Sequence, residues 1–393
     1  MLSFGSKIFW PCYMITFVVY MTILLWGLAS GRLLGSVLAY RFLVFYMLMP
    51  GIAGLGGLIL GIKNAKAKWM YPILCGGLSY IIPHILFRSF FTVASIPYLV
   101  FPFLSATLGL IVGMIIFKLH IEHKIKLKKL TKIALATTTA IALIHIIHAF
   151  TLDRVVVYTE VSLTSPNLPP KLNGYRVAFL TDTHFMTEER MWEIVHELNQ
   201  RELDLVTLGG DFAIFTPTMK RTIEVFSHIQ ATDGIFGVEG NHDVYSLIFE
   251  AMEANGITPL SNSGYHIREG FFLAGVEDLW NRNPNISIAL EGSYPEDFVL
   301  LISHNPDVTM RQDTTRVDLT LSGHTHGGQV TFFGIWAPYF TLTSHLTAYG
   351  QRFRSGWALS YDETPVFVSR GVGEYLPRVF ARPEVILVTL YSE

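Results

Sequence analysis

The 393-residue sequence has few charged residues and almost no cysteine. Charged residues make up 15% of the chain and hydrophobic residues 51%, a balance too apolar for a wholly water-soluble protein of this length. Part of the chain is therefore expected to lie in lipid. Both cysteines, Cys12 and Cys75, lie in apolar runs. The aqueous part thus has no thiol that could form a disulfide or bind a metal.

Acidic residues are nearly absent from the first 150 positions, which hold 13 Lys and Arg but only Glu122 as an acid. The other 243 residues hold 16 basic and 30 acidic residues, a net charge of −14. This change of sign predicts a basic-flanked membrane region over 1–150, a linker and first strand over 151–174, and an acidic aqueous domain over 175–393. Neither part has the composition of a nucleic-acid-binding protein, so no nucleic-acid partner is expected.

Five apolar runs in the first 150 residues are long enough to cross a hydrocarbon core of about 30 Å. They are Phe9–Leu28, Leu38–Ile62, Met70–Phe87, Pro97–Phe117 and Ile133–Phe150. Short cytoplasmic loops keep an excess of Lys and Arg, so the basic loops after the second and fourth runs are expected in the cytoplasm. The sequence thus predicts an all-α, multi-pass transmembrane region of five helices, with the aqueous domain outside the cytoplasm.

Two histidines, His145 and His148, lie three residues apart in the last apolar run. They are interpreted either as ligands of a buried metal or haem, or as side chains that pack against their neighbours. The apolar runs offer no further cluster of ligands, which favours packing.

Beyond residue 150, short apolar runs alternate with polar helical stretches, a pattern typical of an α/β or layered α+β domain. Five apolar runs are each followed by a polar cluster, at Asp182 to His184, Asp211, Asn241 to Asp243, His304, and His324 to His326. Each cluster alone is compatible with a turn or a helix cap. Five clusters at strand ends indicate a single metal site, because strand ends are where open α/β sheets bind ligands. Asp, Asn and His favour Mn, Fe or Zn over Ca²⁺.

The order of these clusters resembles the calcineurin-like metallophosphoesterase family: Asp-x-His, Gly-Asp, Gly-Asn-His-Asp, a solitary His and Gly-His-x-His. The motif Gly-His-Thr-His-Gly-Gly-Gln at 323–329, together with Ser369–Gly373 and Arg382–Glu384, resembles the membrane-associated bacterial branch. The resemblance covers about residues 155–393. It implies a four-layer αββα sandwich with the site at the strand ends, and a place in a bacterial inner or plasma membrane.

The resemblance also implies two divalent metal ions and a role for each polar cluster. The first ion would be held by Asp182, His184 and His326, the second by Asn241, His304 and His324, and Asp211 would bridge them. A hydroxide bridging the ions is expected to attack a phosphodiester or pyrophosphate. His242 is placed to donate a proton to the leaving oxygen. Asp243 is expected either to orient His242 or to cap the helix that follows.

The sequence therefore predicts a membrane-anchored phosphoric-ester hydrolase that acts on a phosphate ester, with lipid-linked esters included, beside the bilayer. One alternative is a pyrophosphatase of the UDP-diacylglucosamine type in lipid A synthesis, which requires a cytoplasmic site. Another is a scaffold or sensor that binds metal without turnover. The aromatic stretch Phe332–Tyr349 has two interpretations, contact with lipid or folding over the edge of its own domain.

Overall fold

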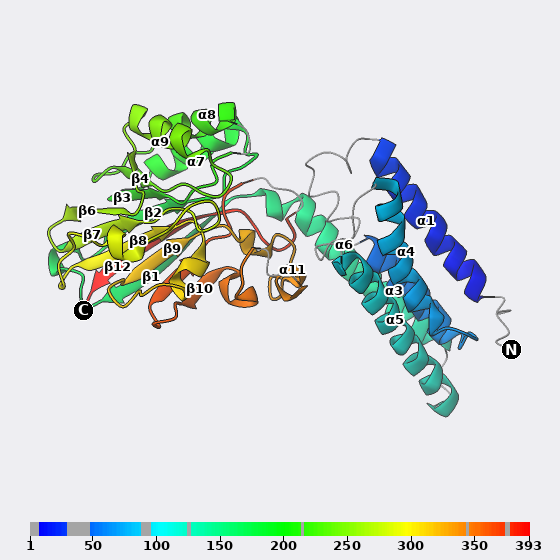
Figure 1. The fold of residues 1–393 in the computed structure, drawn as a ribbon. Coiled ribbons are helices and arrows are strands. Elements are labelled where there is room, and N and C mark those ends of the chain that lie inside the picture. The colour runs from blue at the N-terminus through cyan, green and yellow to red at the C-terminus, as the bar shows by residue number, and fades with distance from the viewer. Residues whose placement is uncertain are drawn as a thin grey trace. The chain divides into compact units, whose positions relative to one another are not determined.

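The computed structural model describes residues 8–29, 48–87, 96–123, 127–213, 216–342, 346–373 and 378–393. The chain divides into two compact units, Met1–Ile144 and His145–Glu393. Helix α6, Leu127–Phe150, begins in the first unit, and its last residues belong to the second. The ribbon of both units is drawn in Figure 1.

The described part of the first unit is helical. Besides the start of α6, its helices are α1 (Phe9–Ala29), α3 (Met49–Ile62), α4 (Met70–Phe87) and α5 (Ile96–His123). Helices α3 and α5 approach closely at glycines: a Cβ atom at Gly57 would lie 2.2 Å from the carbonyl oxygen of Ala106, and one at Gly61 would lie 2.4 Å from that of Leu110. Small residues at a helix contact are typical of helix pairs in membranes.

Two helical segments are long and apolar enough to cross a membrane, Leu99–Leu119 and Ala136–Arg154. The sequence predicted five spans. The searched parts of the other apolar helices, Phe9–Thr22, Met49–Ile62 and Met70–Ile81, are shorter than the roughly 20 residues that a span needs, although α1 as a whole extends to Ala29 and α4 to Phe87. Residues 38–47 of the second predicted span lie outside the described part of the chain, as do Lys124 and Lys126 of the basic link.

The second unit contains two six-stranded sheets. The first has the order β1 (Val157–Ser165), β12 (Glu384–Ser392), β2 (Tyr175–Leu180), β3 (Leu205–Leu208), β4 (Ile235–Gly237) and β5 (Thr258–Pro259). The second has the order β10 (Gly356–Leu359), β11 (Pro365–Val368), β9 (Leu319–Ser322), β8 (Phe298–Ser303), β7 (Phe271–Gly275) and β6 (Ser263–Arg268). Strands β2 to β5 are parallel, and so are β7, β8, β9 and β11, so each sheet gathers carboxyl ends at one edge.

Helices α7 (Glu188–Asn199), α8 (Thr216–Phe226) and α9 (Tyr245–Ala254) form a layer beside the first sheet (Figure 1). Their buried apolar residues, such as Ile194 and Ile223, pack with Val206 of β3. A second cluster, which includes Phe179 and Leu300, fills the space between the two sheets. The mixed α/β domain predicted from the sequence is confirmed.

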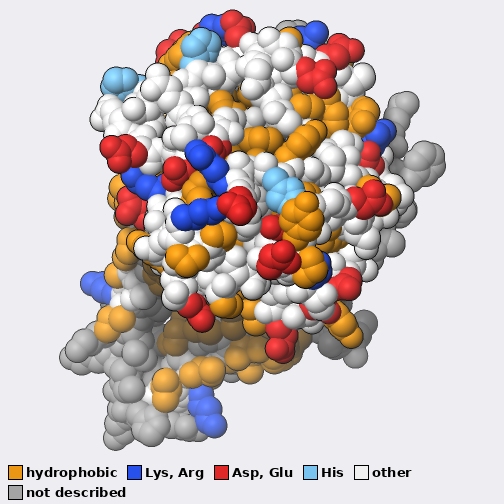
Figure 2. All heavy atoms as spheres, turned by 90° about the vertical axis from the view of Figure 1, so that its left-hand side faces the viewer, with side chains coloured by type: hydrophobic (Ala, Val, Ile, Leu, Met, Phe, Trp, Pro, Cys, Tyr) orange, Lys and Arg blue, Asp and Glu red, His pale blue; other side chains and the backbone are white. Residues whose placement is uncertain are grey.

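Short helical segments complete the second unit. Over the second sheet, α10 (Ile286–Ala289) packs with Ala274 and Leu301. The remaining segments are α11 (Pro338–Leu342) and the 3-10 turns η3 (Leu152–Arg154), η4 (Pro170–Leu172), η5 (Pro306–Met310), η6 (His326–Gly328) and η7 (Gly350–Phe353). The face of this unit drawn in Figure 2 intersperses acidic, basic and small apolar patches, as expected of a surface in contact with water.

The two histidines of the last apolar run lie in the second unit and pack against its aromatic residues. The His145 ring centroid is 4.5 Å from that of Phe333, and the His148 ring stacks on Phe380 at 3.8 Å. His148 Nδ1 lies 2.7 Å from Asp153 Oδ2. These contacts support the packing interpretation of both histidines.

Candidate metal centre

The polar clusters predicted from the sequence follow strand ends in both sheets. Asp182 comes just after β2, Asp211 after β3 and Asn241 after β4, all in the first sheet. His304 comes just after β8 and His324 after β9, both in the second sheet. The distances between their side-chain atoms, given below, show that residues from the two sheets lie close together.

A first group of converging ligand atoms consists of Asp182, His184 and His326. The Nε2 atoms of the two histidines are 3.1 Å apart, and Asp182 Oδ1 lies 3.5 Å from His326 Nε2 and 3.9 Å from His184 Nε2. Ligand atoms bound to one ion at about 2.0–2.2 Å lie roughly 3 to 3.6 Å apart in tetrahedral geometry. The group therefore has nearly the dimensions of a metal site.

A second group consists of Asp211, His304 and His324. His304 Nε2 lies 3.3 Å from Asp211 Oδ2 and 3.2 Å from His324 Nδ1. Asn241 joins this group, because its Oδ1 is 3.2 Å from His304 Nε2. The same Asp211 oxygen also lies 3.5 Å from His184 Nε2 of the first group. Asp211 is thus the carboxylate that the two groups share.

The backbone at most of these residues has a positive φ, which non-glycine residues rarely adopt. The angles are 56° at Asp182, 44° at His184, 57° at Asp211, 68° at His324 and 50° at His326. Each such residue costs on the order of 1–3 kcal/mol, so the surrounding structure has to hold it in place. Strain concentrated at these positions is typical of a preorganised functional site.

Burial sets the protonation of the site in the absence of an ion. It lowers the pKa of His184 to about 4 and that of His324 to about 3, so both rings are neutral at pH 7 and keep a lone pair for a metal. Burial raises the pKa of Asp182 to about 6. Asp182 Oδ1 is buried and accepts no hydrogen bond from the described residues, a deficit that a divalent cation would remove. The donor set fits a borderline transition metal.

Asp243 makes contacts that neither of its predicted roles includes. Its Oδ2 accepts hydrogen bonds from the backbone N–H groups of Asp211 at 2.7 Å and Gly240 at 2.8 Å, and its Oδ1 accepts one from Phe212 at 2.9 Å. Helix α9 begins after Val244 without a side-chain cap, so the capping interpretation is wrong. Since both oxygens bind backbone amides, Asp243 holds the Asp211 turn in shape.

His242 lies at the edge of the site with an exposed side chain. Its backbone N–H donates to Asp211 Oδ1 at 2.8 Å, and its ring centroid is 5.4 Å from that of His184. The ring therefore faces the first group of ligands without belonging to either group.

The segment after β7 supports the site, although it was not predicted from the sequence. Asp278 Oδ2 accepts the backbone N–H groups of Trp280 at 2.9 Å and Asn281 at 2.8 Å, and the Asn281 side chain donates to the carbonyl of Asn241. The sequence does carry a signal for this segment, because the apolar run of β7 is followed at once by acidic residues, as the other site strands are followed by polar ones.

A fully buried arginine, Arg378, holds the loop behind Asp182. It donates to the carbonyl oxygens of Gly373 at 3.0 Å, Arg370 at 2.9 Å and Ala381 at 3.0 Å, and the Gly373 N–H donates to the carbonyl of Asp182 at 2.9 Å. Burial lowers the pKa of Arg378 to about 10, so it stays charged at neutral pH. The Ser369–Gly373 motif thus acts as a backbone support for Asp182.

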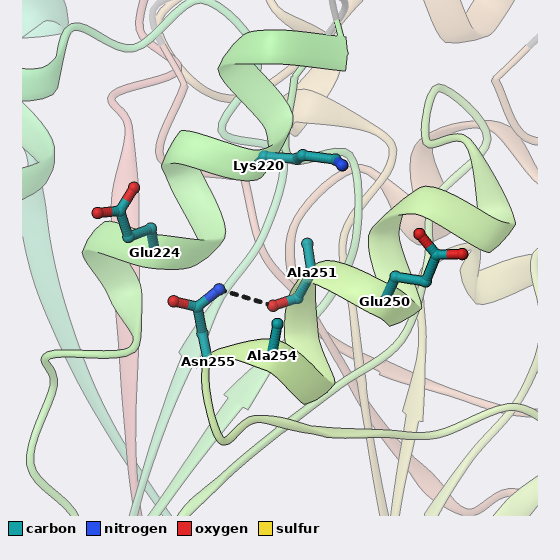
Figure 3. A pocket seen from close by; sticks show the side chains of 6 residues that line it. All are labelled: Lys220, Glu224, Glu250, Ala251, Ala254 and Asn255. Carbon is teal, nitrogen blue, oxygen red and sulfur yellow. Dashed lines mark hydrogen bonds between the residues drawn. The ribbon is translucent and has the colours of Figure 1, made fainter.

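One surface hollow lies apart from this centre, between α8 and α9. It is lined by Lys220, Glu224, Glu250, Ala251, Ala254 and Asn255. The Asn255 side chain donates to the carbonyl of Ala251 at 2.8 Å (Figure 3). None of the ligand groups lines it, so the chemistry of the domain is assigned to the strand ends.

Two α/β sheets that bring groups of Asp and His side chains together at their strand ends are typical of a metal-dependent hydrolase. Residues 175–328 match the family described as "Calcineurin-like phosphoesterase". The chain carries a domain of this family and is a metal-dependent phosphoesterase.

Relatives of this chain are found in bacteria and vertebrates. The metallophosphoesterase YkuE of Bacillus subtilis is 29% identical over 60% of this chain and 85% of its own length. "Phosphodiesterase YaeI" of Escherichia coli is 29% identical over 55% of this chain and 82% of its own length. "Transmembrane protein with metallophosphoesterase domain" of Danio rerio is 28% identical over 66% of this chain, and the match spans 62% of that relative.

Proposed function

We propose that this chain is a membrane-anchored hydrolase that uses two divalent ions to cleave a phosphodiester or pyrophosphate. The observation that carries the proposal is the position of Asp211 Oδ2, 3.3 Å from His304 Nε2 and 3.5 Å from His184 Nε2. One carboxylate oxygen within reach of both ligand groups supports two ions that share a ligand, rather than two independent sites. The relative named a phosphodiesterase supports the reaction class.

The residues of the chain fit the demands of phosphate-ester hydrolysis. Two bound ions would lower the pKa of water and offset negative charge on the phosphoryl group. Neutral His184 and His324 leave the positive charge of the ions uncompensated, which attracts an anionic substrate. His242 is exposed beside the first ligand group, where its ring can donate a proton to the leaving oxygen.

The reaction is tested on the full chain purified in detergent, with an aryl phosphodiester as substrate. We expect hydrolysis with added Mn²⁺ and loss of activity after a chelator removes metal, with recovery when Mn²⁺ is returned. Bound metal is counted in the same samples. A protein that holds its metal but hydrolyses no phosphodiester, pyrophosphate or phosphomonoester would instead be the metal-binding scaffold or sensor.

Three observations support the membrane anchor. Leu99–Leu119 and Ala136–Arg154 are long and apolar enough to span, glycines pack α3 against α5, and the Danio rerio relative is named a transmembrane protein. We propose the multi-pass arrangement predicted from the sequence, with the catalytic unit outside the cytoplasm. The basic link between the last two spans supports this orientation, because short cytoplasmic loops carry an excess of Lys and Arg.

Cysteine labelling in intact cells tests the orientation. A single cysteine replaces Tyr361, which is 75% exposed in the catalytic unit, in a chain whose Cys12 and Cys75 are changed to Ala. We expect a membrane-impermeant thiol reagent to label Tyr361→Cys without cell lysis. Labelling only after lysis would reverse the orientation. It would then favour the UDP-diacylglucosamine-type pyrophosphatase, whose site has to face the cytoplasm.

A further inference from the structure

A short hairpin after the last metal-binding motif displays large apolar side chains. Phe332 and Trp336 pair across it, with the Phe332 N–H donating to the Trp336 carbonyl at 2.7 Å. Phe332 is 51% exposed, Trp336 41% and Ile335, near the tip, 78%. The stretch therefore does not fold over the edge of its own domain at these positions, although Phe340 further along is buried.

The base of the hairpin is fixed to the domain. Thr331 donates its backbone N–H to the carbonyl of Val379 at 2.9 Å, and its Oγ1 lies 3.1 Å from the carbonyl of Phe380. The Gly334 N–H donates to Thr331 Oγ1 at 2.9 Å, and this bond closes the turn. These bonds hold the apolar side chains in the exposed position.

The hairpin lies against the end of the second candidate span, within the same unit. His145 of α6 stacks on Phe332 at 5.5 Å and contacts Phe333 at 4.5 Å. Nearby residues of α6 are apolar and exposed, with Ile147 at 58% and Phe150 at 66%. The exposed apolar side chains of the hairpin and of this helix end are together called the apolar rim: Ile147, Phe150, Phe332, Phe333, Ile335 and Trp336.

We infer that the apolar rim is a membrane-contact surface of the catalytic unit, with the hairpin inserted into the headgroup and upper acyl region of the same bilayer that holds α6. This inference rests on the membrane anchoring proposed above. The occupant follows from adjacency, because the hairpin contacts His145 of α6, and this helix also carries the exposed apolar side chains of Ile147 and Phe150, which need lipid. Its chemistry also fits, since Trp and Phe favour the interface, where apolar surfaces insert by about 5–10 Å.

The position of Arg154 fits insertion of the hairpin into the bilayer interface. Arg154 ends the candidate span, is exposed, and places its guanidinium 5.9 Å from the Phe150 ring centroid. An arginine at the end of a span can extend its charge to the lipid phosphates while its stem lies along apolar surface. The edge of the bilayer is thus assigned to the level of Arg154, with the rim on its apolar side.

Fluorescent probes at single cysteines test the inference on the full chain reconstituted into phosphatidylcholine vesicles. The background again lacks Cys12 and Cys75, and an environment-sensitive probe is attached at Ile335→Cys. Tyr361→Cys is the matched control, because Tyr361 is 75% exposed, close to the 78% of Ile335, and its backbone N–H donates to the carbonyl of Thr309 in η5 rather than to the hairpin. Leu143→Cys, at a position of the candidate span that is 51% exposed, reports whether the anchor is inserted.

Lipids with brominated acyl chains are expected to quench the probes at Ile335 and Leu143 and to leave the probe at Tyr361 unchanged. Iodide in the water should quench Tyr361 alone. Quenching at Leu143 without quenching at Ile335 would overturn the inference while the anchor stands, whereas no lipid quenching at either site would remove the anchor too. An Ile335 probe shielded from both quenchers would show a protein contact instead. Trp336→Cys provides a second probe site on the same hairpin.

Discussion

Replacing Asp211 by Asn is expected to lower kcat/KM by about a thousandfold or more. The substitution keeps the shape of the side chain but removes the charge that lies between the two ligand groups. Loss of about 4 kcal/mol of charge stabilisation in the transition state would give this factor, since each 1.36 kcal/mol changes a rate tenfold. The measurement combines steady-state kinetics with metal analysis, and bound metal is expected to fall with the activity.

Asp313→Asn is the control for that variant. Asp313 undergoes the same chemical change, but its carboxylate is exposed and, among the described residues, accepts hydrogen bonds from Thr315 alone. Its activity and metal content should equal those of the unaltered protein. Should Asp211→Asn retain full metal content and an unchanged rate, Asp211 would not be the shared ligand and the two-ion proposal would fail.

Replacing His242 by Ala is expected to lower kcat by roughly 100- to 10,000-fold for substrates with an alkoxide leaving group, the usual contribution of a general acid. The effect should be much smaller for a nitrophenyl ester, because nitrophenolate leaves without protonation. Metal content should not change, since the exposed ring belongs to neither ligand group. The test compares the two substrates on the same variant, and an equal loss on both would remove the general-acid role.

Asp243→Asn separates orientation of His242 from support of Asp211. Its two carboxylate oxygens accept three backbone N–H groups, whereas an amide has only one oxygen to accept them. We expect metal affinity to fall about 10- to 100-fold, as when other supports of metal ligands are removed, with both leaving groups affected alike. A selective loss on the alkoxide ester would restore the orienting role predicted from the sequence.

The metal-ligand residues were the part of the site that the sequence predicted best, because their side chains can bind metal directly. Asp182, Asn241 and His324 stand directly after apolar runs, and parallel strands bring such positions to one edge of a sheet. The resemblance added the grouping of ligands, and the structure brings the same residues together at distances suited to metal. The mixed α/β class followed from the alternation of apolar runs with helical stretches.

The supports of the site were harder to predict, because they act through backbone groups and distant segments. Asp243, in the loop after β4, binds the amide of Asp211 in the loop after β3, and Arg378 supports the site through loop carbonyls. Nothing in their side-chain chemistry distinguishes them from a helix cap or a surface arginine. The number of spans stays a prediction beyond the two candidate spans, since hydropathy shows where a run is apolar but not how long its helix is.

The position of β12 has a consequence for synthesis of the protein. This strand, the last of the chain, lies between β1 and β2, and its residue Glu384 pairs with Val157. At roughly 5–20 residues per second a ribosome needs on the order of ten to forty seconds to make the 200-odd residues between the paired strands. During that time the N-terminal helices have already emerged, while the first sheet lacks an inner strand and leaves the edges of β1 and β2 open. Shielding of the nascent domain by chaperones is therefore expected to matter more for its yield than for that of an enzyme whose sheet grows outward in chain order.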